Sequence, residues 1–153
     1  MSLILVLSLF FVPDQIVASN KMVVVDLNKM TWTAFQGGQV VRTGKAVGGS
    51  ARCSDNKRRG CKSPIGTFTI KSKRGRNYRS HKYPLDCANK AKCGARMYYA
   101  MHLSSKSGEA LHGSDMMVDY NASHGCIRLY PKDAEWLNKN FVEIGMPVTI
   151  LPY

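Results

Sequence analysis

Short, strand-like patterns of apolar and polar residues fill the first part of the chain. Residues 22–27 (MVVVDL) are rich in valine, and residues 31–36 alternate apolar and polar side chains through Trp32 and Ala34. Both patterns predict β-strands. Residues 37–38 are a Gly-Gly pair, which predicts a hairpin turn into a third strand over residues 39–43.

Similar patterns return later in the chain and are followed by one helix. Strands are predicted over residues 67–71, 97–103 and 109–112. The helix is predicted over residues 131–141, because proline suits a first turn, acidic residues suit the positive end, and the apolar side chains share one face. A Gly-Met-Pro sequence at residues 145–147 ends it.

The predicted fold is therefore mainly β: a β-sandwich with one α-helix packed on it, directly after Cys126. About a tenth of the chain is then helical, well below the usual third for globular proteins. The Gly-, Lys- and Arg-rich stretches over residues 42–61 and 73–96 are predicted to be loops or insertions.

The N-terminus resembles an export signal. Residues 3–12 are almost unbroken apolar sequence, too short to span a bilayer, and small residues follow at 17–19. We therefore predict a cleaved signal peptide over residues 1–19 and a single domain over residues 20–153, with a basic, disulfide-bearing insertion around residues 48–97. The region before the apolar run has no Lys or Arg, so a buried strand or a start site set too early is the alternative.

Positive charge is concentrated in one segment. The chain has a formal net charge of +12. Residues 42–96 contain sixteen Lys and Arg against Asp55 and Asp86, a charge of +14, so the rest of the chain is slightly acidic. Such a segment favours polyanions: nucleic acid, anionic lipid headgroups or the acidic polymers of a bacterial envelope, although basic runs are often only a solvated surface. No nucleic-acid-binding motif is present, so nucleic acid is not an expected partner.

Five cysteines divide into two pairs and one single residue. Cys53 and Cys61 flank one basic loop, and Cys87 and Cys93 flank another. In an exported protein such pairs predict disulfides; four cysteines allow three pairings, of which the sequence-local one is the simplest. The alternative is a four-cysteine zinc site, but these spacings do not match the usual one. No metal site is expected, and Cys126 remains as a free thiol.

Candidate chemistry is concentrated in residues 123–129 (SHGCIRL). His124 lies two positions before Cys126, and His112 lies fourteen positions before it. A thiol needs an imidazole within hydrogen-bond reach to become a nucleophile near neutral pH, and a neighbouring helix N-terminus would help hold the thiolate. The Gly125 and Cys126 N–H groups are the predicted oxyanion hole.

This block, with His112-Gly113 upstream, resembles the signature of the L,D-transpeptidase (YkuD-like) catalytic domain. The resemblance extends to the Pro-x-Gly-x-Phe stretch at residues 64–68, to the helix at residues 131–137 and to a closing strand at residues 145–150. It therefore covers roughly residues 22 to 151. The cysteine block is specific, whereas the Pro-x-Gly stretch alone would be weak.

The resemblance implies roles for individual residues. Cys126 is the expected nucleophile and His112 the general base, with the Gly113 carbonyl orienting the His112 ring. His124 is expected either to support the loop by hydrogen bonding or, less in keeping with the family, to transfer a proton.

The remaining polar residues near the block have more open roles. Arg128 is expected to bind a substrate carboxylate, with an ordinary salt bridge as the alternative. Ser123 is expected to brace the loop and to contribute to substrate binding. Asp115 and Asp119 are alternative partners that could orient His112.

The function implied by the resemblance is peptidoglycan L,D-transpeptidation. Cys126 would take an acyl group from a stem tetrapeptide with release of D-alanine, and an amine of a neighbouring stem would accept it. Water or a lipoprotein lysine are alternative acceptors, and a non-catalytic basic envelope-binding module is the alternative of another class. No cofactor is implied. We expect a monomer in the periplasm or cell envelope, without a transmembrane segment in the mature chain.

Overall fold

The computed structural model describes residues 20–153, and the predicted signal peptide over residues 1–19 lies outside the described residues. The strands are β1 (Lys21–Asp26), β2 (Thr31–Gln36), β3 (Gln39–Val47), β4 (Gly66–Lys73), β5 (Tyr98–Leu103), β6 (Ala110–Gly113), β7 (Ile127–Leu129) and β8 (Pro147–Ile150). The helical segments are α1 (Lys90–Cys93), α2 (Pro131–Trp136) and the π-helical turn η1 (Leu137–Phe141).

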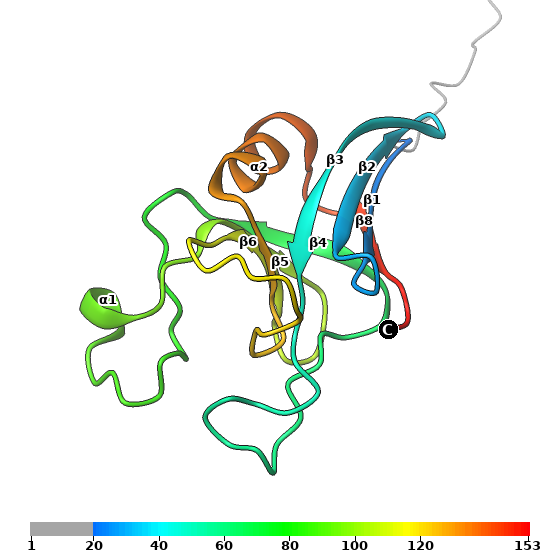
Figure 1. Ribbon diagram of the computed structural model, residues 1–153. Helices are drawn as coiled ribbons and strands as arrows, with labels where there is room; N and C mark the ends of the chain where they lie inside the picture. The colour runs from blue at the N-terminus through cyan, green and yellow to red at the C-terminus, as the bar shows by residue number, and fades with distance from the viewer. Residues whose placement is uncertain (1–19) are drawn as a thin grey trace, which may run out of the picture.

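Two sheets face each other and continue into one another at both edges (Figure 1). One sheet has the order β3-β2-β1-β8-β4 and the other β3-β7-β6-β5-β4, so the shared strands β3 and β4 close the structure into a barrel. Most neighbouring strands are antiparallel, whereas β1/β8 and β6/β7 are parallel. The prediction of a mainly β sandwich is confirmed. Within residues 20–153 the two sheets have no open edge, because β3 and β4 belong to both of them.

The hydrophobic alternation seen in the sequence determines which face of each strand is buried. In β1, Val23 and Val25 are fully buried, and in β2 the same holds for Trp32 and Ala34. Their neighbours point outward, as the period of two in a strand requires. The Gly37-Gly38 turn has positive φ angles of 59° and 78°, the conformation that a two-residue hairpin of this type needs.

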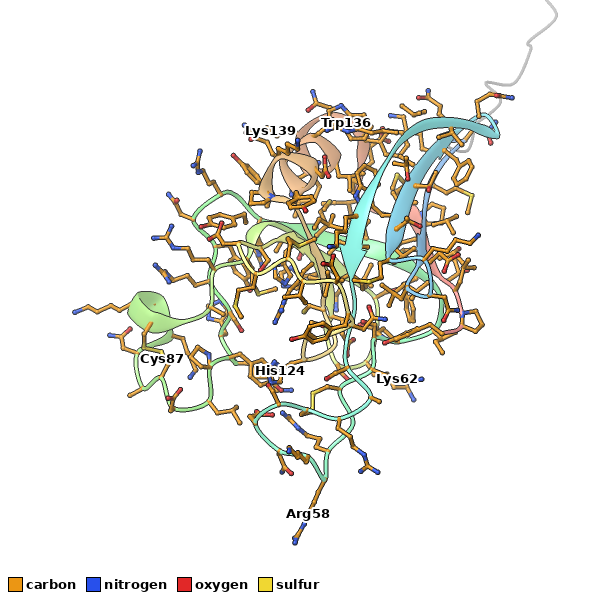
Figure 2. The ribbon with its side chains drawn as sticks, in the orientation of Figure 1. Arg58, Lys62, Cys87, His124, Trp136 and Lys139 are labelled. Atoms are coloured by element: carbon orange, nitrogen blue, oxygen red, sulfur yellow. A yellow bond between two sulfur atoms is a disulfide. The ribbon has the colours of Figure 1, made fainter. Side chains whose placement is uncertain are left out.

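The predicted helix over residues 131–141 is present as α2 and η1. Ala134, Leu137 and Phe141 are buried against the core, so the predicted apolar face is the packed one. The last turn is π-helical, which the sequence pattern does not distinguish. Figure 2 shows Trp136 and Lys139 on this helical segment, at the opposite end of the molecule from Arg58.

Three features of the sequence-based assignment were wrong or incomplete. Residues 44–47 were predicted as loop but continue strand β3, where Ala46 and Val47 are buried. The three-residue strand β7 was not predicted, because so short a run shows no periodicity. The segment over residues 73–96 contains the short helix α1.

Both basic loops are closed by the sequence-local disulfides. Cys53 bonds to Cys61, and Cys87 bonds to Cys93. Among the described residues, Cys126 is the free cysteine. We name residues 53–61 the first stapled loop and residues 73–96 the second stapled loop. No helix within residues 20–153 is long and apolar enough to cross a bilayer.

Candidate active site

The parallel pair β6/β7 places the candidate nucleophile and base on one face of a sheet. Leu111 is opposite Ile127 and His112 is opposite Arg128. Leu111 and Ile127 are buried in the core. Because side chains alternate along a strand, His112 and Arg128 point to the other face, as does Cys126, one residue before Ile127. His112 and Cys126 are thus diagonal neighbours on the outer face of this sheet, and both line the same cleft.

His112 is held by its own neighbour. Its Nδ1 lies 2.9 Å from the Gly113 carbonyl oxygen. A carbonyl can only accept, so Nδ1 carries the proton and Nε2 has a free lone pair. The hydrogen bond expected from the family resemblance is therefore present. Burial lowers the pKa of His112 to about 4, only partly offset by this hydrogen bond, so the ring is neutral around pH 7.

The cysteine is a protonated thiol at rest. Burial raises the pKa of Cys126 above its usual range, although a backbone hydrogen bond at Ala110 opposes the shift. We expected the helix N-terminus to help hold a thiolate, and this was wrong. Strand β7 and Tyr130 stand between Cys126 and the first residue of α2, and the effect of a helix end fades within one turn. A neutral thiol beside a neutral imidazole is therefore the resting state.

Ser123 closes the loop that carries the nucleophile. Its hydroxyl donates to the Cys126 carbonyl and accepts from the Gly125 N–H at 3.1 Å. Ser123 is buried, and Gly125 has a φ of +115°, a conformation that favours glycine. The Ser123 hydroxyl thus makes the contacts that the expected bracing role requires, and the Gly125 N–H is engaged within the loop. The role of Ser123 in substrate binding and the oxyanion hole of Gly125 and Cys126 stay predictions.

His124 contacts both stapled loops, and Figure 2 shows it nearer the middle of the molecule than either Arg58 or Cys87. Its Nε2 lies 3.3 Å from Oδ1 of Asp55, and its ring stacks on Tyr83 with centroids 4.5 Å apart. Arg59 completes the group: it contacts both Asp55 carboxylate oxygens at 3.1 Å and donates to the Tyr83 hydroxyl at 2.8 Å. We call Asp55, Arg59, Tyr83 and His124 the loop clamp. His124 is thus held by side chains of both stapled loops, and its supporting role stays a prediction.

Arg128 lies in the same cleft without a counter-ion. No described carboxylate is within ion-pair distance of its guanidinium, so the ordinary salt bridge considered from the sequence is not present. Burial lowers the pKa of Arg128, which means that the positive charge is partly desolvated. A half-buried, unpaired guanidinium in a cleft is suited to bind a carboxylate in a two-pronged contact.

The alternative partners of His112 are engaged elsewhere. Asp115 accepts from the Tyr98 hydroxyl at 2.8 Å, and Asp119 is exposed and paired with Lys45. Three residues of the site could not be found from the sequence: Asp55, Tyr83 and Glu109. Each comes from outside the cysteine block and reaches the site only through the folding of a loop.

The cleft that contains both candidate catalytic residues has a volume of about 320 Å³. We call it the His112 cleft. Cys126, His112, His124 and Arg128 line it together with Tyr83 of the second stapled loop. It is thus built jointly by the β6/β7 pair and by the basic insertion. In residues 20–153 no cluster of potential metal ligands occurs.

Fold and site define a closed β-structure with a cysteine and a histidine in one cleft, an arrangement typical of cysteine-dependent acyl transfer. The family model of the L,D-transpeptidase catalytic domain, YkuD, matches residues 20–150, and the chain belongs to this family. L,D-transpeptidases of this family are enzymes. No curated protein is significantly similar to the chain in sequence.

Solved structures of L,D-transpeptidases have the same fold. The chain is 29% identical to an L,D-transpeptidase from Xylanimonas cellulosilytica DSM 15894, with a TM-score of 0.70 over 92% of this chain and 64% of that one. It is 26% identical to L,D-transpeptidase LdtMt1 in complex with imipenem (TM-score 0.69, 87% and 59% covered). It is also 26% identical to L,D-transpeptidase 1 of Mycobacterium tuberculosis (TM-score 0.63, 88% and 62% covered). The chain therefore spans about three fifths of the length of these structures.

Proposed function

We propose that this protein is a peptidoglycan L,D-transpeptidase that crosslinks stem peptides through an acyl-enzyme on Cys126. The observation that carries the proposal is the position of Cys126 and His112 as diagonal neighbours in one cleft, with His112 Nε2 free to accept a proton. The family to which the chain belongs supports the same reaction class.

The reaction begins from the neutral pair. A donor tetrapeptide enters the His112 cleft, and the Arg128 guanidinium binds its terminal carboxylate. As the Cys126 sulfur attacks the carbonyl of the third residue, the thiol proton passes to His112 Nε2. The Gly113 carbonyl, which accepts from Nδ1, stabilises the imidazolium that forms. Breakage of the amide bond then releases D-alanine, whose amine takes the proton from His112 and leaves a thioester.

The second half-reaction resolves the thioester. An amine of another stem attacks the carbonyl, His112 takes the proton of the amine, and Cys126 leaves as the thiol. Water in place of the amine would give an L,D-carboxypeptidase, and a lipoprotein lysine would give an anchoring enzyme. A decayed, purely binding module is the alternative of another class.

Mass spectrometry of muropeptides after incubation with tetrapeptide stems tests these alternatives. We expect crosslinked dimers with the wild type and none with Cys126→Ala. The alanine side chain is uncharged, as the protonated thiol is at neutral pH, and it is only slightly smaller. Tripeptides without dimers would identify a carboxypeptidase. Unchanged stems with retained binding to sacculi in both proteins would support a binding module and contradict the proposal. Intact mass should also show an imipenem adduct that the alanine variant lacks.

We further propose that the protein acts in the periplasm or cell envelope and that its basic segment holds it on anionic envelope polymers. The two disulfides favour an extracytoplasmic location. Lys57, Arg58 and Lys62 are exposed on or beside the first stapled loop, next to the loop clamp. Figure 2 shows Arg58 at the tip of that loop, pointing away from the rest of the molecule. A polyanionic surface would therefore meet the protein on the side that carries the site.

A further inference from the structure

A second cleft reaches Cys126 from another side. Its volume is about 190 Å³, and it shares Cys126, Tyr83 and His124 with the His112 cleft. His112 lines only the first cleft, and Glu109 lines only the second. We call this second space the Glu109 cleft. Cys126 thus lines two compartments that differ in their charged side chains.

Glu109 is fixed in place, and one of its oxygens is directed to the nucleophile loop. Its backbone N–H donates to the Ser105 hydroxyl at 3.1 Å, and that hydroxyl in turn donates to Oε2. Its other oxygen, Oε1, would be 3.7 Å from a Cβ built on Gly125. Glu109 is half-buried, and among residues 20–153 it is the only carboxylate that lines this cleft. A rigid carboxylate therefore lies against the residue that precedes Cys126.

When the Glu109 cleft is empty, the negative charge of this carboxylate disfavours ionisation of the Cys126 thiol. After burial, the charge of Glu109 is a further cause that raises the pKa of the thiol. No described Lys or Arg forms an ion pair with Glu109 that would neutralise it. A half-buried negative charge beside a sulfur that must become anionic is unfavourable, unless a cation of the substrate occupies the space between the two.

We propose that Glu109 is the specificity-determining residue for the acyl acceptor and binds its ammonium group in the Glu109 cleft. The proposal rests on the proposed function, because it requires an acyl-enzyme on Cys126. The acceptor is a stem peptide that offers the side-chain amine of a diamino acid. Lys82, which is exposed and lines the same cleft, would meet a carboxylate of that stem. A cleft with one carboxylate and one ammonium fits such a zwitterion better than a basic protein tail.

Binding at Glu109 leads directly to the second half-reaction. The bound ammonium first loses one proton to solvent and becomes a nucleophilic amine. As its nitrogen forms a bond to the thioester carbon, a second proton passes to neutral His112. The carbon–sulfur bond then breaks, and His112 returns that proton to the departing Cys126 sulfur. Glu109 itself exchanges no proton in these steps; it concentrates and orients the acceptor.

The partition of the acyl-enzyme between amine and water tests the proposal. Donor tetrapeptide is supplied with increasing acceptor stem, and crosslinked dimer, tripeptide and released D-alanine are measured. For Glu109→Gln we expect the acceptor KM to rise by about tenfold, the usual value of a hydrogen bond to a charged group. D-alanine release with donor alone reports any effect of the lost charge on Cys126 itself, and at a fixed acceptor concentration the ratio of dimer to tripeptide should fall. Glu109→Asp, which keeps the charge but shortens the side chain, should lie between the two.

Control variants separate a charge effect from a binding effect. Glu143→Gln removes one exposed negative charge that lines neither cleft and should leave the partition unchanged. An unchanged acceptor KM in folded Glu109→Gln, with faster alkylation of Cys126, would mean that Glu109 acts only on the thiol and would overturn the proposal. A Glu109-dependent preference for a peptide with a free lysine over the stem would overturn the assignment of the acceptor. Absence of any acyl-enzyme in wild type would instead contradict the proposed function.

Discussion

The Nε2 atom of His124 lies 3.3 Å from Oδ1 of Asp55, so the loop that carries the nucleophile is attached to a loop stapled by a disulfide. The ring of Tyr83, in the second stapled loop, stacks on the ring of His124. Arg59 donates hydrogen bonds both to the Tyr83 hydroxyl and to Asp55. The basic insertion is therefore part of the site. Its side chains hold His124, two residues from Cys126, and its backbone holds neighbouring Ser123, whose N–H donates to the Gly48 carbonyl at 2.9 Å.

Loosening the loop clamp should slow acylation without unfolding the protein. Asp55→Asn removes the negative partner of both His124 and Arg59. We expect imipenem acylation of Cys126, followed by intact mass, to slow by about two- to fivefold, in the range of a partly exposed ion pair. Asp86→Asn is the matched control, because Asp86 is an exposed aspartate of the second stapled loop outside the clamp. Equal rates for both variants and wild type would contradict a positioning role.

Acylation should depend on pH as expected for a neutral pair. Because the pKa of His112 is about 4, the base loses its free lone pair only near that pH, well below the usual range of histidine. The acid limb of the acylation rate should therefore lie near pH 4. Simple alkylation by iodoacetamide, which needs the thiolate, should be slower at pH 7 than for free cysteine, because burial raises the pKa of Cys126. A fast, pH-independent alkylation between pH 5 and 8 would indicate a thiolate–imidazolium pair instead.

Burial of neutral His112 also predicts a pH-dependent stability. Its folded pKa of about 4 is below the unfolded value of 6.5, so the unfolded chain binds more protons between these values. The free energy of unfolding should fall as the pH drops from 6.5 to 4, by about 3 kcal/mol from this group, and the effect should level off below pH 4. Other groups titrate in the same range. The contribution of His112 is therefore measured by urea unfolding of wild type and His112→Gln at several pH values. If the free energy of unfolding of the two proteins depends on pH in the same way, the prediction is disproved.

The sequence contains the local elements of this structure but not the contacts between loops. Strands β1 and β2 were predictable because alternation reports which face is buried, and the motif around Cys126 identified the nucleophile loop. The contact between Asp55 and His124 was not predictable, because both lie in irregular segments whose approach depends on the whole barrel. Gly125 illustrates the same limit: its neighbours in sequence suggested a free N–H, but the loop turns this donor onto Ser123.

The basic segment makes a prediction of its own about binding to sacculi. Lys57→Gln/Arg58→Gln removes two exposed charges near the site, and Lys29→Gln/Lys132→Gln removes two exposed charges elsewhere, before β2 and on α2. In a pull-down with purified sacculi, we expect the first variant to bind more weakly at low salt and to depend less on salt than the second. Identical salt dependence for both would mean that the charges of the first stapled loop are only solvated.

Arg128 should select donors by their terminal carboxylate. It is half-buried in the His112 cleft and has no counter-ion among the described residues, whereas Arg42 at the other end of the barrel is paired with buried Asp133 at 2.8 Å. Arg128→Gln should raise the KM for a free tetrapeptide by about tenfold or more, because a two-pronged contact to a carboxylate is lost, and Arg128→Lys should recover only part of it. A tetrapeptide amidated at its C-terminus carries no carboxylate, so its turnover should be low with the wild type and little changed in either variant. An equal loss for both donors would show that Arg128 acts on the site in general, by lowering the pKa of neighbouring His112, rather than on the carboxylate of the donor.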